Sequence, residues 1–572
     1  MAGAELMSMV MRTALRGVGI AVVLAMGMAA CGGGDDGDDG EAQGSKGGTL
    51  YILDQSDFEH LDPARNYVTN SGDFGQRLLY RALTQYKAEP GKAGLEIAPD
   101  LATDLGQASP DRKTWTFTLK DGLKYEDGST ITAQDVKYGT ERSFAPDLPE
   151  GPPWARQLLV GGADYKGPYE DKGGLDSIET PDDKTIVFHL NQPVADFNYA
   201  TTFPLFGPVP KAKDTGVKYD NHVFSSGPYK IETYDRGKEL VLVRNTHWDQ
   251  KTDPVRKARP DRIVYKMGID PNVIDQRLVS DQGDDQYALM LSDVQPSTVS
   301  KIVTNPDVKD RLSQDISGCN RYLALNTANP PMDDLAVRQA VNYALSQKAY
   351  QTSRGGPFIG KITTETMPAS LAGHKDFNLY PNNNGEGDPE KAKQILADAG
   401  YPNGVEVTLT GTSEPGGYGP DQSAAIQESL AKAGIKVKIN AVSESVYYTE
   451  IGNAKRESEM VYYGWCPDWP SARTFLPPLF DSRFIAPQGN TNVSQLDDPK
   501  IDKRIDEIYA MSDPDKANQA WGDLDEMIME EAAAAPLMDD NRSSLYGSKV
   551  TGAYPHQAFS SLIDLATVGV AK

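Results

Sequence analysis

The spacing of hydrophobic and polar residues changes along the chain, near residue 319. Before it, hydrophobic residues mostly alternate with polar ones, which is the two-residue period of a strand with one buried face. The pattern predicts strands at 47–55, 184–190 and 261–270, hairpins at 113–129 and 227–245, and helices at 71–86 and 132–144. Thr132 is the expected N-cap of the last helix. We therefore expect the first part of the chain to be rich in antiparallel β-structure.

After residue 319, the pattern alternates between helical and strand segments. It predicts helices at 331–347, capped by Asp333 or Asp334, and at 388–401, which has a proline in its first turn and Gly400 at its exit. Residues 405–443 then form a strand, an amphipathic helix and a second strand, and both strands are apolar enough for a parallel sheet. The second part is therefore expected to be of the α/β class.

Residues 1–30 have the pattern of a signal peptide. Arg12 and Arg16 precede an apolar stretch at 18–28, which ends in small residues directly before Cys31. The "MAAC" ending resembles a bacterial lipobox, so Cys31 is a candidate for lipidation; the alternative is an ordinary signal peptide with a chance cysteine. Residues 31–46 are rich in glycine and aspartate and are expected to form a flexible tether. The spacing of a calcium-binding EF-hand loop is absent from this run.

Composition narrows the possible partners. The 572 residues carry a formal net charge of −24, so the protein should repel nucleic acid and anionic lipid headgroups. No segment outside the signal region has the length and apolarity of a transmembrane span. We expect an exported protein that is held at the outer face of the cell membrane, or in the periplasm, by its lipid alone.

The sequence contains few residues typical of catalytic or metal sites. It has no G-x-S-x-G, H-E-x-x-H or P-loop motif, and its six histidines are scattered singly. We therefore expect neither an enzyme nor a bound cofactor or metal ion, although a secreted hydrolase is kept as an alternative.

Cys319 and Cys466 are the two cysteines after Cys31. Outside the cytosol such a pair is typical of a disulfide; two buried free thiols are the alternative.

The segment "YYGWCPDWP", residues 462–470, places Asp468 between Trp465 and Trp469. A carboxylate that aromatic rings shield from water is costly unless it is paired, and an ammonium group would pair it. In the alternative interpretation, Pro467 and Asp468 form a turn, Asp468 bonds its own backbone, and the aromatic residues belong to a core.

Four stretches resemble one family. These are "WTFTLKDGLKYEDGSTITAQDVKYGTERS", "SSGPYKIETYDRGKELVLVRNTHWD", "YLALNTANPPMDDLAVRQAVNYAL" and "DPEKAKQILADAGYPNG". In this order they are similar to extracytoplasmic solute-binding proteins of the peptide/nickel class of ABC importers, such as the oligopeptide- and dipeptide-binding proteins. The resemblance runs from about residue 47 to the C-terminus. It implies a monomer that binds a peptide or small solute and delivers it to the permease subunits of an ABC transporter.

The resemblance also implies a fold, the two-lobed periplasmic-binding-protein fold of type II with an extra domain inserted in the N-terminal lobe. Applied to this chain, it gives residues 47–86 and 225–318 to lobe I, 87–224 to the inserted subdomain, 319–538 to lobe II, and 539–572 to a C-terminal return into lobe I.

Several binding residues follow from the resemblance. In oligopeptide-binding relatives a Trp-Cys-x-Asp segment lies on the cleft wall, where its backbone pairs with the peptide and its aspartate holds the α-ammonium. Cys466 would pair with Cys319 as in those relatives. The candidate residues on this wall are Tyr463, Gly464, Trp465, Cys466, Asp468 and Trp469. On a second wall, Tyr67, Thr69, Asn70 and Ser71 are candidates; in the alternative interpretation this loop is a helix start capped by Ser71 or Asp73.

One departure from the family concerns the ligand carboxylate. Dipeptide-binding relatives clamp it with an arginine between a strand and the next helix, but residues 411–422 here contain no arginine or lysine. Tyr418 and the backbone amides around Gly416 and Gly417 are what this stretch offers. This favours a longer peptide or another cationic ligand over a short peptide fixed at both ends. A nickel chelate, a sugar and an opine are further alternatives.

Overall fold

The computed structural model describes residues 46–414, 417–511 and 513–572. The predicted signal peptide, the lipidation candidate Cys31, nearly all of the tether, and Gly416 lie outside these residues. Within them, no helix is both long and apolar enough to cross a membrane.

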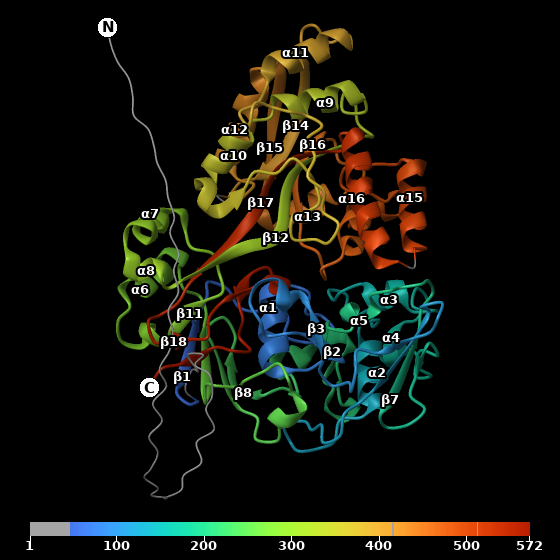
Figure 1. Cartoon of the computed structure of the whole chain (residues 1–572), viewed down its shortest axis with the longest axis vertical. Helices are drawn as coiled ribbons and strands as arrows, with labels where there is room; N and C mark the ends of the chain where they lie inside the picture. Colours follow the sequence, from blue (N-terminus) through green and yellow to red (C-terminus); the bar gives the residue numbers. More distant parts are fainter. Residues whose placement is uncertain (1–45, 415–416, 512) are drawn as a thin grey trace, which may run out of the picture. The chain divides into compact units, whose positions relative to one another are not determined.

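A mixed five-stranded sheet dominates the first part of the chain (Figure 1). Its strand order is β11 (Ala288–Met290), β1 (Thr49–Leu53), β10 (Arg262–Lys266), β9 (Glu239–Arg244) and β8 (Tyr229–Asp235). β1 is parallel to both of its neighbours, whereas β8 and β9 form the predicted hairpin, which turns at Gly237 with a φ of +74°. The predicted strands at 47–55 and 261–270 are confirmed.

A second, four-stranded sheet is inserted between β1 and β8 in the sequence. Its order is β4 (Gln107–Ala108), β5 (Thr114–Thr118), β7 (Thr185–His189) and β6 (Ile178–Glu179). The hairpin predicted at 113–129 is wrong, because β5 pairs along its whole length with β7 about seventy residues later. Trp115 and Phe117 of β5 are buried in the same core as Ile186 and Phe188 of β7. The strand predicted at 184–190 is confirmed.

The six-stranded sheet of the second part has the order β13, β17, β12, β16, β14 and β15. In the same order, these strands span Gly360–Lys361, Ala534–Leu545, Leu312–Leu325, Met460–Trp465, Val405–Thr412 and Ile435–Val442. β14 and β15 are parallel and are joined by α12 (Pro420–Ala431), as the pattern at 405–443 predicts. β12 and β17 are the two long strands that Figure 1 shows side by side, and they pair from Leu312↔Leu545 to Ala324↔Ala534.

Three short two-stranded ladders complete the β-structure. They are β2 (Thr84–Tyr86) with β3 (Ile97–Pro99), β18 (Val550–Thr551) with β21 (Gly569–Val570), and β19 (Pro555–His556) with β20 (Leu562–Ile563).

The helices of the first part are α1 (Thr69–Phe74), α2 (Ala133–Arg142), α3 (Trp154–Leu158), α4 (Gly167–Glu170), α5 (Phe197–Ala200), α6 (Pro271–Ser280), α7 (Pro296–Thr304) and α8 (Pro306–Lys309). Those of the second part, besides α12, are α9 (Leu335–Ala344), α10 (Gln347–Ser353), α11 (Pro389–Asp398), α13 (Glu444–Ile451), α14 (Leu476–Phe480), α15 (Pro499–Tyr509) and α16 (Pro514–Glu530).

Local capping chemistry explains several helix boundaries. Thr132 and Asp135 form a capping box at the start of α2, and the Asp334 carboxylate accepts the Ala336 N–H at the start of α9. The helix predicted at 71–86 is shorter than expected. After α1 the chain makes a π-helical turn at Gly75–Leu79, and residues 84–86 become β2. This segment is buried on all sides, so tertiary packing overrides its helical spacing.

The two parts of the chain each build a large hydrophobic core. One collects apolar residues of the first part together with C-terminal residues such as Phe559, Ile563 and Val570. The other packs helices against the six-stranded sheet, with Leu323, Val461 and Leu537 at its centre. The end of the chain therefore returns to the core that the beginning of the chain builds.

Candidate ligand-binding site

A cavity of about 80 Å³ is lined by segments that lie far apart in the sequence. Its walls come from residues 66–76, 202–204, 466–468 and 558–560. Pockets that enclose a drug-sized ligand have volumes of roughly 300–1,000 Å³. The walls must therefore separate to admit such a ligand.

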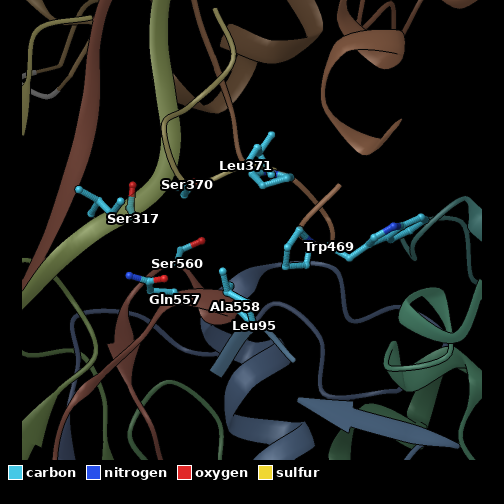
Figure 2. Close-up of a pocket in the computed structure, with 12 residues that line it drawn as sticks. Leu95, Ser317, Ser370, Leu371, Trp469, Gln557, Ala558 and Ser560 are labelled. Carbon is cyan, nitrogen blue, oxygen red and sulfur yellow. The ribbon is translucent and has the colours of Figure 1, made fainter. Parts of the chain in front are cut away.

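A second, smaller cavity of about 30 Å³ shares Pro467, Ala558 and Ser560 with the first (Figure 2). Ser317 of β12, Ser370 and Trp469 line its other sides. The loop that follows β16 therefore forms part of the wall of both cavities.

Asp468 lies in the wall of the larger cavity and is half-buried. Its Oδ2 accepts a hydrogen bond of 2.9 Å from the Tyr67 hydroxyl. Burial raises the pKa of Asp468 to about 7, and the donor groups of Tyr67 and Trp154 offset part of that rise. None of the ion pairs among the described residues includes Asp468. A group with a positive charge would therefore find an unneutralised partner here.

The two tryptophans beside Asp468 point into different cores. The indole N–H of Trp465 donates to the Thr474 carbonyl, and its ring packs on the second core. Trp469 is only 2% exposed and belongs to the first core, where its ring meets that of Trp154 with centroids 4.6 Å apart. Its N–H donates to Asp196. The Asp468 carboxylate itself is hydrogen-bonded to Tyr67, from the first part of the chain.

The second predicted wall is only partly at the cavity. Tyr67 and Thr69 line it, whereas Asn70 and Ser71 do not. Ser71 is buried, and its hydroxyl bonds Asn66 Oδ1 and the Val68 carbonyl. The alternative in which Ser71 or Asp73 caps the helix is wrong, because α1 begins at Thr69 without a side-chain cap.

Tyr463 and Gly464 belong to strand β16, and neither lines the cavity. Tyr463 is buried in the second core against Tyr322, and Gly464 pairs with Arg321 of β12. On the other side, the ladder with β14 covers only Met460 and Val461. From Tyr462 onward this edge of β16 has no strand partner among the described residues, so it could pair with an extended ligand.

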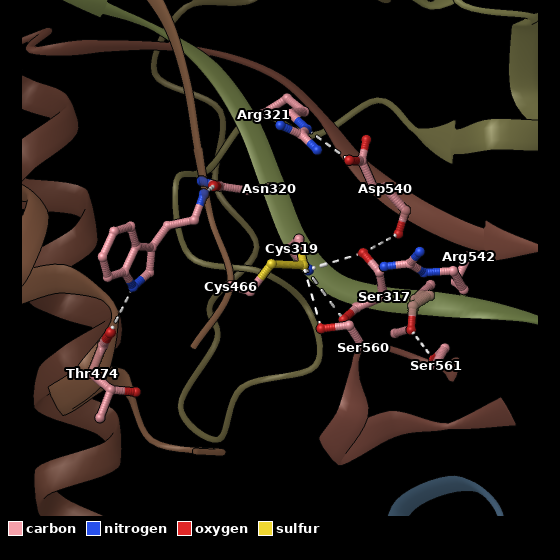
Figure 3. The surroundings of a disulfide bond; sticks show 12 residues. Ser317, Cys319, Asn320, Arg321, Cys466, Thr474, Asp540, Arg542, Ser560 and Ser561 are labelled. Atoms are coloured by element: carbon pink, nitrogen blue, oxygen red, sulfur yellow. Dashed lines mark hydrogen bonds and ion pairs between the residues drawn. A yellow bond between two sulfur atoms is a disulfide. The ribbon is translucent and has the colours of Figure 1, made fainter. Parts of the chain in front are cut away.

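A disulfide joins Cys319 of β12 to Cys466 at the end of β16, as the resemblance implied (Figure 3). The two cysteines are therefore bridged, and the alternative of two buried free thiols is wrong. Cys466 also lines the cavity, next to Asp468. The bridge therefore fixes the start of the Asp468 loop to a long strand of the sheet.

Tyr418 lies in the second core, away from both cavities. Its ring stacks on Tyr462 and Tyr447, with centroids 5.4 Å apart in each case, and its hydroxyl bonds the Arg321 guanidinium.

Sequence reasoning missed Trp154, Asp196, Phe203 and the C-terminal residues 558–560. No local motif marks these residues, since they reach the site through packing alone.

One group among the described residues has the atoms to hold a metal ion. Carboxylate or imidazole atoms of Glu365, His374 and Asp376 lie within 4.8 Å of one another. Both carboxylate oxygens of Glu365 already accept backbone N–H groups, and none of the three residues lines either cavity.

Comparison with known proteins agrees with this architecture. The family model described as "Bacterial extracellular solute-binding proteins, family 5 Middle" matches residues 96–486, which is more than half of the chain. The glutathione-binding protein GsiB of Salmonella paratyphi A is 25% identical over 468 residues, covering 79% of this chain and 83% of that protein.

Solved structures share the fold. The clavulanic acid biosynthesis oligopeptide binding protein 2 has a TM-score of 0.87 and 35% identity, covering 92% of this chain and 96% of that chain. The periplasmic binding protein DppA from Helicobacter pylori, in complex with the peptide STSA, has a TM-score of 0.72 and 23% identity, with 92% and 99% covered. The predicted type II periplasmic-binding-protein fold is confirmed, and so is the prediction of a binding protein rather than an enzyme. The chain belongs to family 5 of the bacterial extracellular solute-binding proteins.

Proposed function

We propose that this protein is the substrate-binding lipoprotein of an ABC importer, which captures peptides between two lobes and delivers them to a membrane permease. Asp468 is the observation that carries the proposal. Its carboxylate is shielded and has no ionic partner within the part of the chain that the structure describes, and it lies in a cavity wall near the end of a strand with an open edge. A peptide supplies both complements, an α-ammonium for the carboxylate and a backbone for the edge.

The printed names of the relatives support a peptide ligand, since they include glutathione-, oligopeptide- and murein-tripeptide-binding proteins. A protein of the same fold is described in complex with agropinic acid, so an opine is the second candidate. A nickel chelate, a sugar and other small cationic solutes are the further alternatives. We propose the lobe boundaries given above, with the C-terminal return at 539–572 completing lobe I. We also propose anchoring through Cys31 and a monomeric state.

Substitution of Asp468 tests the proposal. Asp468→Asn should weaken binding of a free-amine peptide by roughly 2–5 kcal/mol, because it removes the charged partner of the ammonium. N-acetylation of the peptide should cost the wild type about as much and the variant little more. Isothermal titration calorimetry on peptides identified by mass spectrometry of the co-purified ligand measures both effects.

Asp525→Asn is the matched control. Asp525 is also buried with a raised pKa, but it bonds Thr366 and Met367 and does not line either cavity. This variant should bind peptide like the wild type. Equal affinities of acetylated and free peptides for the wild type would contradict the role of Asp468, and turnover of the peptide would point to a hydrolase.

A further inference from the structure

The floor of the larger cavity consists of Gln76, Tyr86, Thr202 and Phe559. The Tyr86 ring meets that of Phe559 edge-on, with centroids 5.7 Å apart, and both rings belong to the first core. Tyr86 is 3% exposed and Gln76 is 7% exposed. Side chains packed in this way hold their positions, so the floor presents its polar groups to the cavity in a fixed arrangement.

The amide group of Gln76 directs its N–H groups toward the cavity. Gln85 Oε1 accepts the Tyr86 N–H at 2.8 Å, so the Gln85 amide nitrogen is the group that donates to Gln76 Oε1, at 3.2 Å. The Gln76 oxygen is thereby engaged, whereas its Nε2 has no hydrogen bond among the described residues. This Nε2 lies beside Gly72, another lining residue, since a Cβ atom there would be 3.7 Å away. Gln76 therefore offers unused donors to the cavity.

The Tyr86 hydroxyl is a second unused group on the floor. Its oxygen is buried and has no hydrogen-bond partner among the described residues. Burial raises the pKa of Tyr86, and the nearby Thr202 hydroxyl offsets only part of this rise, so Tyr86 remains a neutral donor. The Thr202 proton itself goes to the Tyr199 carbonyl, at 2.8 Å. A buried hydroxyl without a partner is costly, and a ligand atom that accepts its proton removes this cost.

Charge at the cavity restricts the ligand side chain. Asp468 is the only residue with a charged side chain among the described residues that line it, and the proposed function assigns that carboxylate to the ammonium group. Besides burial, the Asp468 charge raises the pKa of Tyr86, so the carboxylate lies within electrostatic reach of the floor. An acidic ligand side chain would lie there without a counter-charge, and a basic one would compete with the ammonium for Asp468. A neutral side chain is therefore favoured.

The size of the cavity suits one side chain. A water molecule requires roughly 10–15 Å³ of such space, so the cavity of about 80 Å³ holds roughly five to eight groups of that size. The side chains of asparagine and leucine have about four non-hydrogen atoms each, which is within this capacity. The remainder of a peptide must therefore lie outside the floor.

We propose that the floor is a subsite for the side chain of the residue that bears the ligand's ammonium group, where Tyr86 and Gln76 select a neutral side chain with a hydrogen-bond acceptor at its end. The ligand class is then a peptide that begins with a carboxamide residue such as asparagine. A carboxamide oxygen has two lone pairs and accepts from both donors, while Thr202 Oγ accepts an amide hydrogen in return. This inference rests on the proposed peptide-binding function and adds a preference at the first position of the peptide.

The test is a competition between peptides that differ only in their first residue. Purified wild-type protein, stripped of ligand, is offered equimolar tripeptides and pentapeptides that begin with asparagine, aspartate, leucine or alanine and continue with alanine. The retained species are quantified by mass spectrometry. Leucine has nearly the shape of asparagine without its polar atoms, and aspartate has that shape with a charge.

Peptides that begin with asparagine should be retained over those that begin with leucine by roughly tenfold, and over those that begin with aspartate by roughly 30-fold. The reason is that leucine leaves the floor donors unpaired, whereas aspartate adds a charge without a partner. The same series with an acetylated N-terminus reports separately on the Asp468 end.

Variants assign the preference to the floor. In Tyr86→Phe, which keeps the ring and loses the hydroxyl, the preference for asparagine over leucine should fall to within about threefold. Gln76→Met keeps the length of the side chain, removes the amide donors and should reduce the preference similarly. Tyr125→Phe is the matched control and should keep the wild-type ratio. The Tyr125 hydroxyl is also buried without a partner among the described residues, but Tyr125 lines neither cavity.

The possible outcomes separate the two proposals. Retention of none of the peptides contradicts the peptide-binding function itself. Equal retention of all first residues, or a preference for leucine, overturns the subsite and leaves the function standing, provided that free amines are still preferred over acetylated ones. A wild-type preference for asparagine that persists in both Tyr86→Phe and Gln76→Met overturns the role of these two residues. If neither variant folds, the ratio of asparagine to leucine peptides on the wild type still decides.

Discussion

At the scale of residues, the Asp468 carboxylate combines shielding with charge. Tyr67 is its hydrogen-bonded partner, and burial shifts its pKa to about 7. Ionising such a carboxylate is costly in the empty protein, because it is shielded from water. Its ionisation becomes favourable when a cation binds next to it. The same residue should therefore lower the stability of the empty protein and raise its affinity for an ammonium ligand.

This gives a pH-dependent prediction. In an unfolded chain an aspartate has a pKa of about 3.9. Because the folded pKa is higher, the unfolded state loses its proton first, so the contribution of Asp468 to stability falls as pH rises from about 4 and is fully lost above about 7. Without ligand, Asp468→Asn should be more stable than wild type by roughly 2–4 kcal/mol at pH 8, and similar to it at pH 4.

Urea unfolding at both pH values measures this difference. Asp525 and Asp539 also have raised pKa values, but both proteins retain them, so the difference between the proteins isolates Asp468. A variant that is less stable than wild type at pH 8 would show that Asp468 stabilises the empty protein, contrary to this account.

At the scale of elements, the join between β12 and β16 positions the site. Six residue pairs, from Asn320↔Trp465 to Leu325↔Met460, form the ladder, and the disulfide closes it at the cavity end. Cys466 is followed within two residues by Asp468, so the bridge holds the binding loop, whereas the ladder holds the strand. Removing the bridge should therefore affect stability and ligand binding together.

The double variant Cys319→Ser, Cys466→Ser tests this role. The bridge connects positions 147 residues apart, so its loss should lower the free energy of unfolding by roughly 3–5 kcal/mol in the loop-entropy model. Peptide affinity should also fall, because the Asp468 loop loses its attachment. Chemical denaturation and calorimetry measure the two effects. An unchanged affinity would show that the ladder alone positions the loop.

At the scale of the whole molecule, Trp469 connects segments that are distant in sequence. It follows β16 of the six-stranded sheet, yet it is buried in the first core against Trp154, with its N–H bonded to Asp196. Arg473 reinforces the contact by approaching Asp196 and the Pro193 carbonyl. The larger cavity lies beside this contact and is too small for a drug-sized ligand, so opening it requires Tyr67 and Asp468 to separate.

Two substitutions at Trp469 separate packing from hydrogen bonding. Trp469→Ala should lower the free energy of unfolding by roughly 3–5 kcal/mol, because it leaves a large cavity in the first core. Trp469→Phe keeps an aromatic ring and loses the bond to Asp196, so it should cost only about 1–2 kcal/mol. Equal effects of the two variants in thermal or urea unfolding would mean that the ring contact with Trp154 contributes little.

Much of the local structure follows from the sequence. Thr132 and Asp334 mark helix starts, and the pattern at 405–443 predicts its parallel strand–helix–strand unit, because capping and hydrophobic period act over a few residues. The resemblance of four stretches identified the family and the cysteine pair. The hairpin predicted at 113–129 was wrong because β5 had an equally suitable partner far along the chain.

The site was decided by the tertiary structure. The sequence marked Asp468 and Tyr67 separately, but only the fold brings them into contact across 401 positions. It also turns Trp465 and Trp469 toward different cores and brings Phe203 and residues 558–560 to the cavity wall. Such contacts depend on how whole sheets and cores pack, and no periodicity or short motif encodes that packing.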